Sequence, residues 1–201
     1  MKKKIVLSFN SFVSFLKIGA KHVLKFSIYN YILFLVLLSI VFSFKKWRKV
    51  CLLVVLITGS YLIAMALIVF SGINVKLDII KFVIPLLIFS LAIINGFSFK
   101  EHLKSKEYMA FAFAVLFGFF NGLGSSENFN LLIGRNESEF IPLIEVAFGV
   151  ISSISIIILL LLLVNTLLQK FIKISKVNWI LGFSIIVICI SFPMIIKQII
   201  Y

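Results

Sequence analysis

The chain has 201 residues, of which 62% are hydrophobic, and it carries a formal net charge of +13. The apolar share is well above the roughly half that is usual in soluble domains, which excludes a soluble globular protein. The basic residues occur in short clusters between apolar segments, a pattern that argues against nucleic-acid binding. The composition therefore predicts a polytopic membrane protein whose main partner is the lipid bilayer.

The N-terminal stretch, residues 5–20, is apolar but is interrupted by Asn10, Ser14 and Lys17. Three interpretations stay open for it: a cleaved signal peptide, an amphipathic helix at the membrane interface, or a further span. We treat residues 1–27 as an N-terminal hydrophobic element and residues 28–201 as the core of a single transmembrane domain, 1–201.

A helix needs about 20 apolar residues to cross the hydrocarbon core of a bilayer. Six segments come close to this length or exceed it: Ile28 to Phe44, Val50 to Ser71, Ile79 to Phe97, Tyr108 to Gly124, Ile141 to Leu168, and Val177 to Ile196. The sequence thus predicts an all-α transmembrane bundle of six full spans plus an N-terminal amphipathic or spanning helix.

Lysines and arginines predict the orientation of these segments. The links after the first, third and fifth segments hold ten of them: Lys45, Lys46, Arg48, Lys49, Lys100, Lys104, Lys106, Lys170, Lys173 and Lys176. The links after the second and fourth segments and the tail after the sixth hold three: Lys76, Arg135 and Lys197. Since basic residues gather on the cytoplasmic side, we expect the first set of links to face the cytoplasm.

Four asparagines lie in apolar surroundings: Asn30, Asn95, Asn121 and Asn165. Amides at such positions commonly hydrogen-bond neighbouring helices. Asn121 is flanked by three glycines, Gly118, Gly122 and Gly124, which let helix backbones approach closely. We expect these glycines at one helix contact, with Asn121 pointing into the bundle.

Few titratable residues occur near the predicted spans. His22 precedes the first segment, whereas His102 lies in a charged link and is expected to be solvated. Glu145, near the start of the fifth segment, could cap the helix or belong to an ion pathway. Asp78 and Lys81 could pair across one helical turn, or Lys81 could anchor the third segment at the interface. No nucleophile, base and orienting acid occur together, so we predict no catalytic residue, no enzyme and no cofactor.

The order of segments resembles the HupE/UreJ family of bacterial nickel and cobalt permeases over nearly the full length. The stretch GAKHVLKFSIYNYILFLVLLSIVF is similar to the family's Gly-x-x-His-Ile-Leu followed by Tyr-Asp-His-Leu-Leu-Phe-Leu. FGFFNGLGSS resembles its Phe-Gly-Leu-x-His-Gly-Leu-Gly-Phe, and IPLIEVAFGVI its Phe-Asn-x-Gly-Val-Glu-x-Gly-Gln. The resemblance implies the permease fold, a bacterial cytoplasmic membrane, and a divalent metal ion as substrate.

His22 falls on the family's first histidine, and the family's glycines fall on Gly59, Gly118, Gly122, Gly124 and Gly149, which we expect to pack helices. Other positions of the family's polar motif residues hold different residues here: Asn30 and Tyr31 for Asp-His, Ser60 and Asn121 for histidines, Lys81 and Ala147 for glutamates.

The remaining candidate metal ligands are His22, Asn30, Asn121 and Glu145, which the predicted topology gathers near the non-cytoplasmic ends of the spans. Amides and a lysine do not offset the dehydration of a divalent ion as carboxylates and imidazoles do. We therefore expect a transporter-like protein with altered or lost metal transport. The alternative is a non-transporting membrane subunit that binds partner membrane proteins or further copies of itself.

Overall fold

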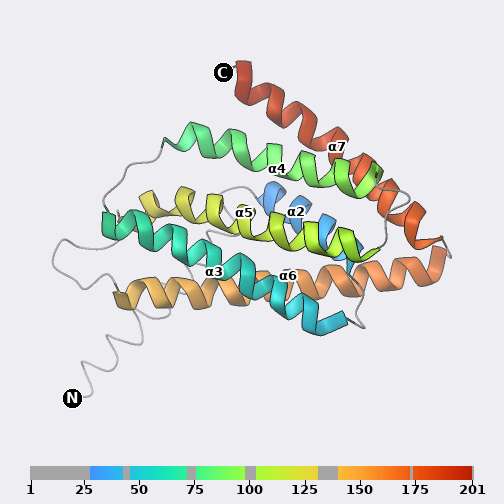
Figure 1. The fold of residues 1–201 in the computed structure, drawn as a ribbon, viewed down its shortest axis with the longest axis horizontal. Helices are drawn as coiled ribbons and strands as arrows, with labels where there is room; N and C mark the ends of the chain where they lie inside the picture. Colours follow the sequence, from blue (N-terminus) through green and yellow to red (C-terminus); the bar gives the residue numbers. More distant parts are fainter. Residues whose placement is uncertain are drawn as a thin grey trace.

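The computed structural model describes residues 28–42, 46–71, 76–97, 103–130, 140–172 and 174–200. These residues form the helices α2 (Ile28–Val41), α3 (Trp47–Ser71), α4 (Leu77–Phe97), α5 (Leu103–Asn130), α6 (Phe140–Ile172) and α7 (Lys176–Ile200). Successive helices run in opposite directions along a common bundle (Figure 1). The described part of the chain is helical throughout, as predicted, whereas the N-terminal element 1–27 lies outside it.

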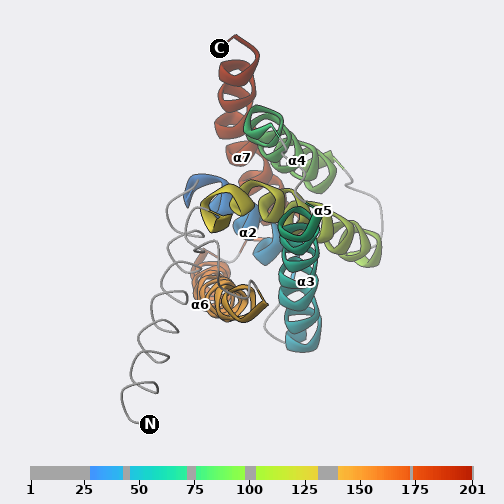
Figure 2. The same cartoon turned by 90° about the vertical axis from the view of Figure 1, so that its left-hand side faces the viewer.

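The expected six full spans are not confirmed, because five of the described helices are long and apolar enough to cross a membrane. The exception is α2, whose 14 residues cover about 21 Å against a hydrocarbon core of about 30 Å. It contacts α4, α5, α6 and α7, and in Figure 2 it lies between α6 on one side and α4 and α7 on the other. A helix surrounded by protein does not have to match the bilayer thickness.

Side chains from other helices bond the carbonyl groups at the end of α2. The last four carbonyls of a helix lack intrahelical donors, and within a membrane few other donors are available. Asn165 Nδ2 donates to the Ser39 carbonyl at 3.0 Å, and Lys176 Nζ donates to the Val41 carbonyl at 3.0 Å. Together with Asn95, whose Nδ2 lies 3.4 Å from the Leu37 carbonyl, these side chains let α2 end inside the bundle.

Asn95 and Asn165 thus confirm the predicted role of amides in holding helices together. Asn95 joins α4 to α2, and Asn165 joins α6 to α2. The side-chain oxygen of Asn165 also accepts a hydrogen bond from Trp179 Nε1 on α7. A single amide therefore links three helices.

Glycines allow α3 and α5 to pack closely. A Cβ atom added to Gly118 would lie closer than 3.0 Å to the Ile57 carbonyl oxygen and to Ser60 Oγ. A Cβ added to Gly122 would meet the Tyr61 carbonyl oxygen just as closely. Residues larger than glycine at either position would therefore push the two helices apart.

Helices α4 and α7 are close at one end and diverge toward the C-terminus of α7 (Figure 1). A Cβ added to Gly96 would lie 3.3 Å from Ser184 Cβ, which marks their close approach. Further along, the rings of Phe89 and Phe192 are still in contact, with centroids 6.2 Å apart. Beyond these rings the helices separate, and a cavity lies between their outer ends.

Candidate functional site

A cavity of about 480 Å³ lies between α2, α4, α5 and α7. Its walls are formed by apolar and polar side chains together: Asn30, Ile80, Lys81, Ile84, Pro85, Asn121, Met194, Lys197 and Gln198. This volume is in the range of small-molecule sites and far exceeds what one bare cation needs.

Two asparagines line the inner part of this cavity. Asn30 is 6% exposed, and its Oδ1 has no hydrogen-bond partner among the described residues, which is a costly arrangement for a buried polar atom. Asn121 is also buried, and its Nδ2 donates to the Phe117 carbonyl of its own helix at 2.8 Å. The structure therefore brings Asn30 and Asn121, two of the four predicted ligands, to one site.

Two lysines line the outer part. Lys81 donates to the Asp78 carboxylate at 3.1 Å, so the pairing across one turn of α4, one of the two arrangements left open by the sequence, is present. Lys197, near the end of α7, has no ion-pair or hydrogen-bond partner among the described residues. The described residues that line the cavity include two ammonium groups and no carboxylate.

The other two predicted ligands are not placed. His22 lies outside the described residues, and Glu145 belongs to the first turns of α6, where its side chain is outside the description. Helix α6 contributes no residue to the cavity walls described above. Across the described chain, no three histidine, cysteine, aspartate or glutamate residues are grouped so as to hold a metal ion.

The glycines named in the sequence have different surroundings. Gly118 and Gly122 lie at the α3–α5 contact, and a Cβ on Gly124 would lie 3.2 Å from Ile80 Cγ2, next to the cavity wall. A Cβ on Gly59 would meet no described atom within 4 Å. Gly149 is buried in α6.

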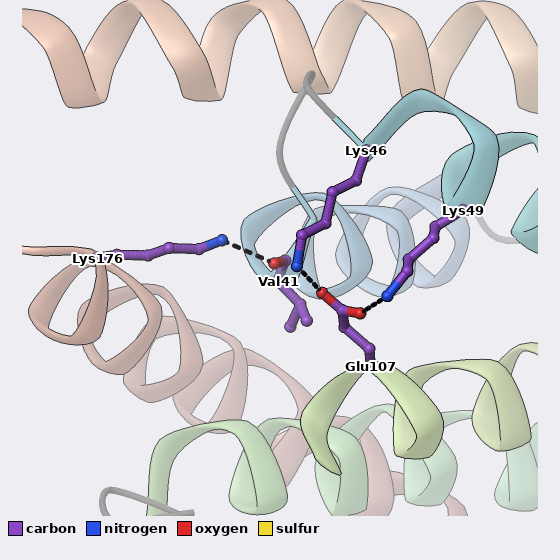
Figure 3. Close-up of polar contacts among 5 residues, drawn as sticks. All are labelled: Val41, Lys46, Lys49, Glu107 and Lys176. Atoms are coloured by element: carbon purple, nitrogen blue, oxygen red, sulfur yellow. Dashed lines mark hydrogen bonds and ion pairs between the residues drawn. The ribbon is translucent and has the colours of Figure 1, made fainter. Parts of the chain in front are cut away.

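A buried ion-pair cluster occupies the opposite end of the bundle (Figure 3). Glu107, near the start of α5, is 3% exposed and bonds both Lys46, just before α3, and Lys49, in the first turn of α3. Lys176 points toward the same region and donates to the Val41 carbonyl (Figure 3). On α2, Val41 is 11 residues from Asn30, or roughly 16 Å along the helix, so the cluster and the cavity are well separated.

Sequence reasoning did not single out Glu107, Lys197 or Gln198. Glu107 adjoins the charged link that holds His102, yet it begins the apolar segment and so enters the bundle with it. A signal was present, since one acid adjoins a predicted span while several lysines occupy the preceding link. Lys197 and Gln198 end an apolar helix, and only the divergence of α7 from α4 makes them part of a cavity wall.

A family model described as HupE / UreJ protein matches residues 2–197. The chain belongs to the HupE/UreJ family. The expected relationship is therefore confirmed, and with its apolar helices the chain is a multi-pass, transporter-like membrane protein of a nickel/cobalt permease family. No curated protein and no solved structure matches the chain.

Family membership gives the cavity its significance. From the resemblance described above, Asn30, Lys81 and Asn121 are expected at the positions of an aspartate, a glutamate and a histidine of the family, and all three line this cavity. Ser60, expected at another of the family's histidine positions, is not among the described lining residues, because its hydroxyl lies against Gly118 at the α3–α5 contact.

Proposed function

We propose that this protein is an inner-membrane member of the HupE/UreJ family that keeps the permease fold and its cavity but has altered or lost nickel and cobalt transport. The observation that carries the proposal is the convergence of Asn30, Lys81 and Asn121 on one cavity. The fold is retained there, while the side chains are ones that do not suit a divalent metal ion.

Inside the cavity a divalent metal ion would meet more repulsion than attraction. An amide oxygen is neutral, so Asn30 and Asn121 cannot neutralise a divalent charge that has lost its water. An ammonium group about 6 Å from such an ion repels it by about 1 kcal/mol in water and about 5 kcal/mol at an effective dielectric constant of about 20. Two lysines line the cavity, and Asp78 balances one of them at most.

The proposal is tested by metal uptake in a nickel-starved bacterial host that expresses the full chain. We expect the wild type to give no more nickel or cobalt accumulation than an empty vector. The triple variant Asn30→Asp, Lys81→Glu, Asn121→His restores the family's residue types, and we expect it to bind nickel more tightly than the wild type. Substitution of Lys76, which is exposed and outside the cavity, serves as the control.

Robust nickel uptake by the wild type that Asn121→Ala abolishes would refute the proposed loss. An inactive but well-folded wild type that co-purifies stoichiometrically with a second membrane protein would instead favour a subunit role. Folding is checked in both cases by size-exclusion chromatography in mild detergent.

A further inference from the structure

We propose that the cavity binds an anionic glycerophosphate group, which a phospholipid headgroup or a free glycerol phosphate could supply. This inference rests on the proposed loss of metal specificity, because both concern the same cavity. It goes further by naming the ligand that the replaced side chains favour.

The cations of the cavity specify an anion. Lys81 and Lys197 come from different helices, α4 and α7, and none of the described residues that line the cavity is a carboxylate. The Asp78 partner of Lys81 is 89% exposed in its side chain, so it lies at the surface rather than within the site. Lys197 has no partner within the described chain and is the stronger attraction for a phosphate.

The amides specify hydrogen-bond donors on the same ligand. Asn30 Oδ1 is buried and has no partner in the part of the chain that the structure describes, and the Nδ2 group of Asn121 is already bonded to its own helix. Pro85 has no N–H, so the Lys81 carbonyl lacks its usual helical donor. Hydroxyl groups on the ligand would satisfy such acceptors, whereas a bare phosphate or carboxylate would not.

The position of the cavity specifies a ligand at headgroup depth. Lys81 is four residues from the start of α4 at Leu77, and Lys197 is three residues from the end of α7 at Ile200. Both therefore lie within roughly one turn of the end of a membrane-spanning helix, where lipid phosphates are found. The apolar side chains of Ile80, Ile84 and Met194 offer a surface to the acyl chains.

Native mass spectrometry of the full chain in mild detergent tests the proposal. Protein is equilibrated with equal amounts of phosphatidylglycerol and phosphatidylcholine, and a second sample receives free glycerol 3-phosphate. We expect retention of phosphatidylglycerol over phosphatidylcholine. Each lysine near the phosphate contributes about a factor of five, so Lys81→Gln with Lys197→Gln should lower that affinity about 30-fold.

Lys76→Gln is the matched control, because Lys76 is an exposed lysine that precedes α4 at the same end of the bundle but does not line the cavity. We expect it to change lipid retention less than twofold. Asn30→Leu keeps both charges while removing the buried acceptor, and we expect weaker binding of either probe. Size-exclusion profiles and thermal unfolding confirm that each variant is folded.

Retention of the lipid alone identifies a lipid site, and retention of glycerol 3-phosphate alone identifies a soluble ligand; both support the shared chemistry. The proposal is overturned if neither probe binds, or if Lys76→Gln weakens binding as much as the double variant. A protein that binds neither probe and no nickel would leave the proposed loss of metal transport standing. Tight nickel binding would refute that loss whatever the probes show.

Discussion

At the residue scale, the bundle uses single polar side chains to satisfy groups that the membrane cannot. Glu107 bonds Lys46 and Lys49, and Asn165 bonds groups on α2 and α7. Both side chains are more than nine-tenths buried. A buried polar group costs free energy unless its partners are in place. Such residues should therefore be sensitive to substitution, while exposed polar pairs should not.

Glu107→Gln tests the buried ion-pair cluster. The substitution removes the charge that balances Lys46 and Lys49 while keeping the shape of the side chain. Because both lysines are 40–45% exposed and can turn to water, we expect a loss of about 1–3 kcal/mol in unfolding free energy rather than the larger cost of a fully buried pair. Thermal unfolding in detergent measures it.

Asp78→Asn provides the comparison for Glu107→Gln. Asp78 also pairs with a lysine, but its side chain is 89% exposed. Surface pairs contribute little, so we expect a change below about 1 kcal/mol. Equal losses for the two variants would contradict the distinction between the buried cluster and the exposed pair.

Asn165→Ala tests the amide that joins α2, α6 and α7. It removes the bonds to the Ser39 carbonyl and from Trp179 Nε1. Interhelical hydrogen bonds in membranes contribute about 0.6 kcal/mol on average, so we expect a loss of about 1–2 kcal/mol for the two. Thr166→Val is the control, since Thr166 Oγ1 bonds only the Leu162 carbonyl of its own helix among the described residues.

Part of this polar bonding between helices could be predicted from the sequence. An asparagine in an apolar segment has few ways to satisfy its amide, so hydrogen bonds from Asn95 and Asn165 to a neighbouring helix could be predicted from their positions in the sequence. Glu107 could not be placed in the same way, because its burial depends on how α3 and α5 begin beside each other. That arrangement is a property of the packed bundle and not of the local sequence.

At the element scale, helix lengths and contacts divide the bundle into a packed centre and lipid-facing spans. The apolar run from Ile28 to Phe44 was long enough to suggest a span, but the helix ends at Val41, where Lys176 bonds its last carbonyl. Hydropathy measures only how apolar a segment is, and a helix buried in protein is as apolar as one in lipid. The other five spans were predictable because their length matches the bilayer.

Gly118→Ala and Gly59→Ala form a matched test of the α3–α5 contact. The added methyl group at position 118 would overlap the Ile57 carbonyl oxygen, whereas at position 59 it would meet no atom of the described residues within 4 Å. Overpacking of this kind costs about 1–3 kcal/mol, while alanine is up to about 1 kcal/mol better than glycine within a helix. We expect a lower melting temperature for Gly118→Ala and an unchanged or higher one for Gly59→Ala.

At the scale of the whole molecule, the two ends of the bundle have different chemistry. The lysine and glutamate cluster lies at the end where α3, α5 and α7 begin, and the cavity lies at the end where α2 and α4 begin. The positive-inside rule predicts that the cluster faces the cytoplasm and the cavity faces outward.

Cysteine labelling from each side of the membrane tests this orientation. Cys51 and Cys189 are free and exposed, so both are first replaced by serine. Single cysteines are then introduced at Arg48 and Lys76, which are both exposed. Arg48 lies in the first turn of α3, and Lys76 directly precedes α4 at the opposite end of the bundle. We expect an impermeant reagent added outside to label position 76 and not position 48; the reverse pattern would invert the topology.

The convergence of Asn30, Lys81 and Asn121 was only partly predictable. Alternating spans place the start of α2 and the end of α5 at one face of the membrane, so Asn30 and Asn121 were expected near each other. The contribution of Lys197 and Gln198 was not expected, because the sequence does not reveal that α7 diverges from α4. The character of the cavity, basic rather than acidic, therefore emerged only from the fold.

Isothermal titration of the purified full chain with nickel and cobalt tests most directly whether the protein has lost its affinity for these ions. We expect no saturable binding of either ion by the wild type below about 1 mM, where the binding free energy is only about 4 kcal/mol. We expect measurable nickel binding by the triple variant Asn30→Asp, Lys81→Glu, Asn121→His. Micromolar nickel binding by the wild type that disappears in His22→Ala or Asn121→Ala would contradict the proposed loss of metal specificity.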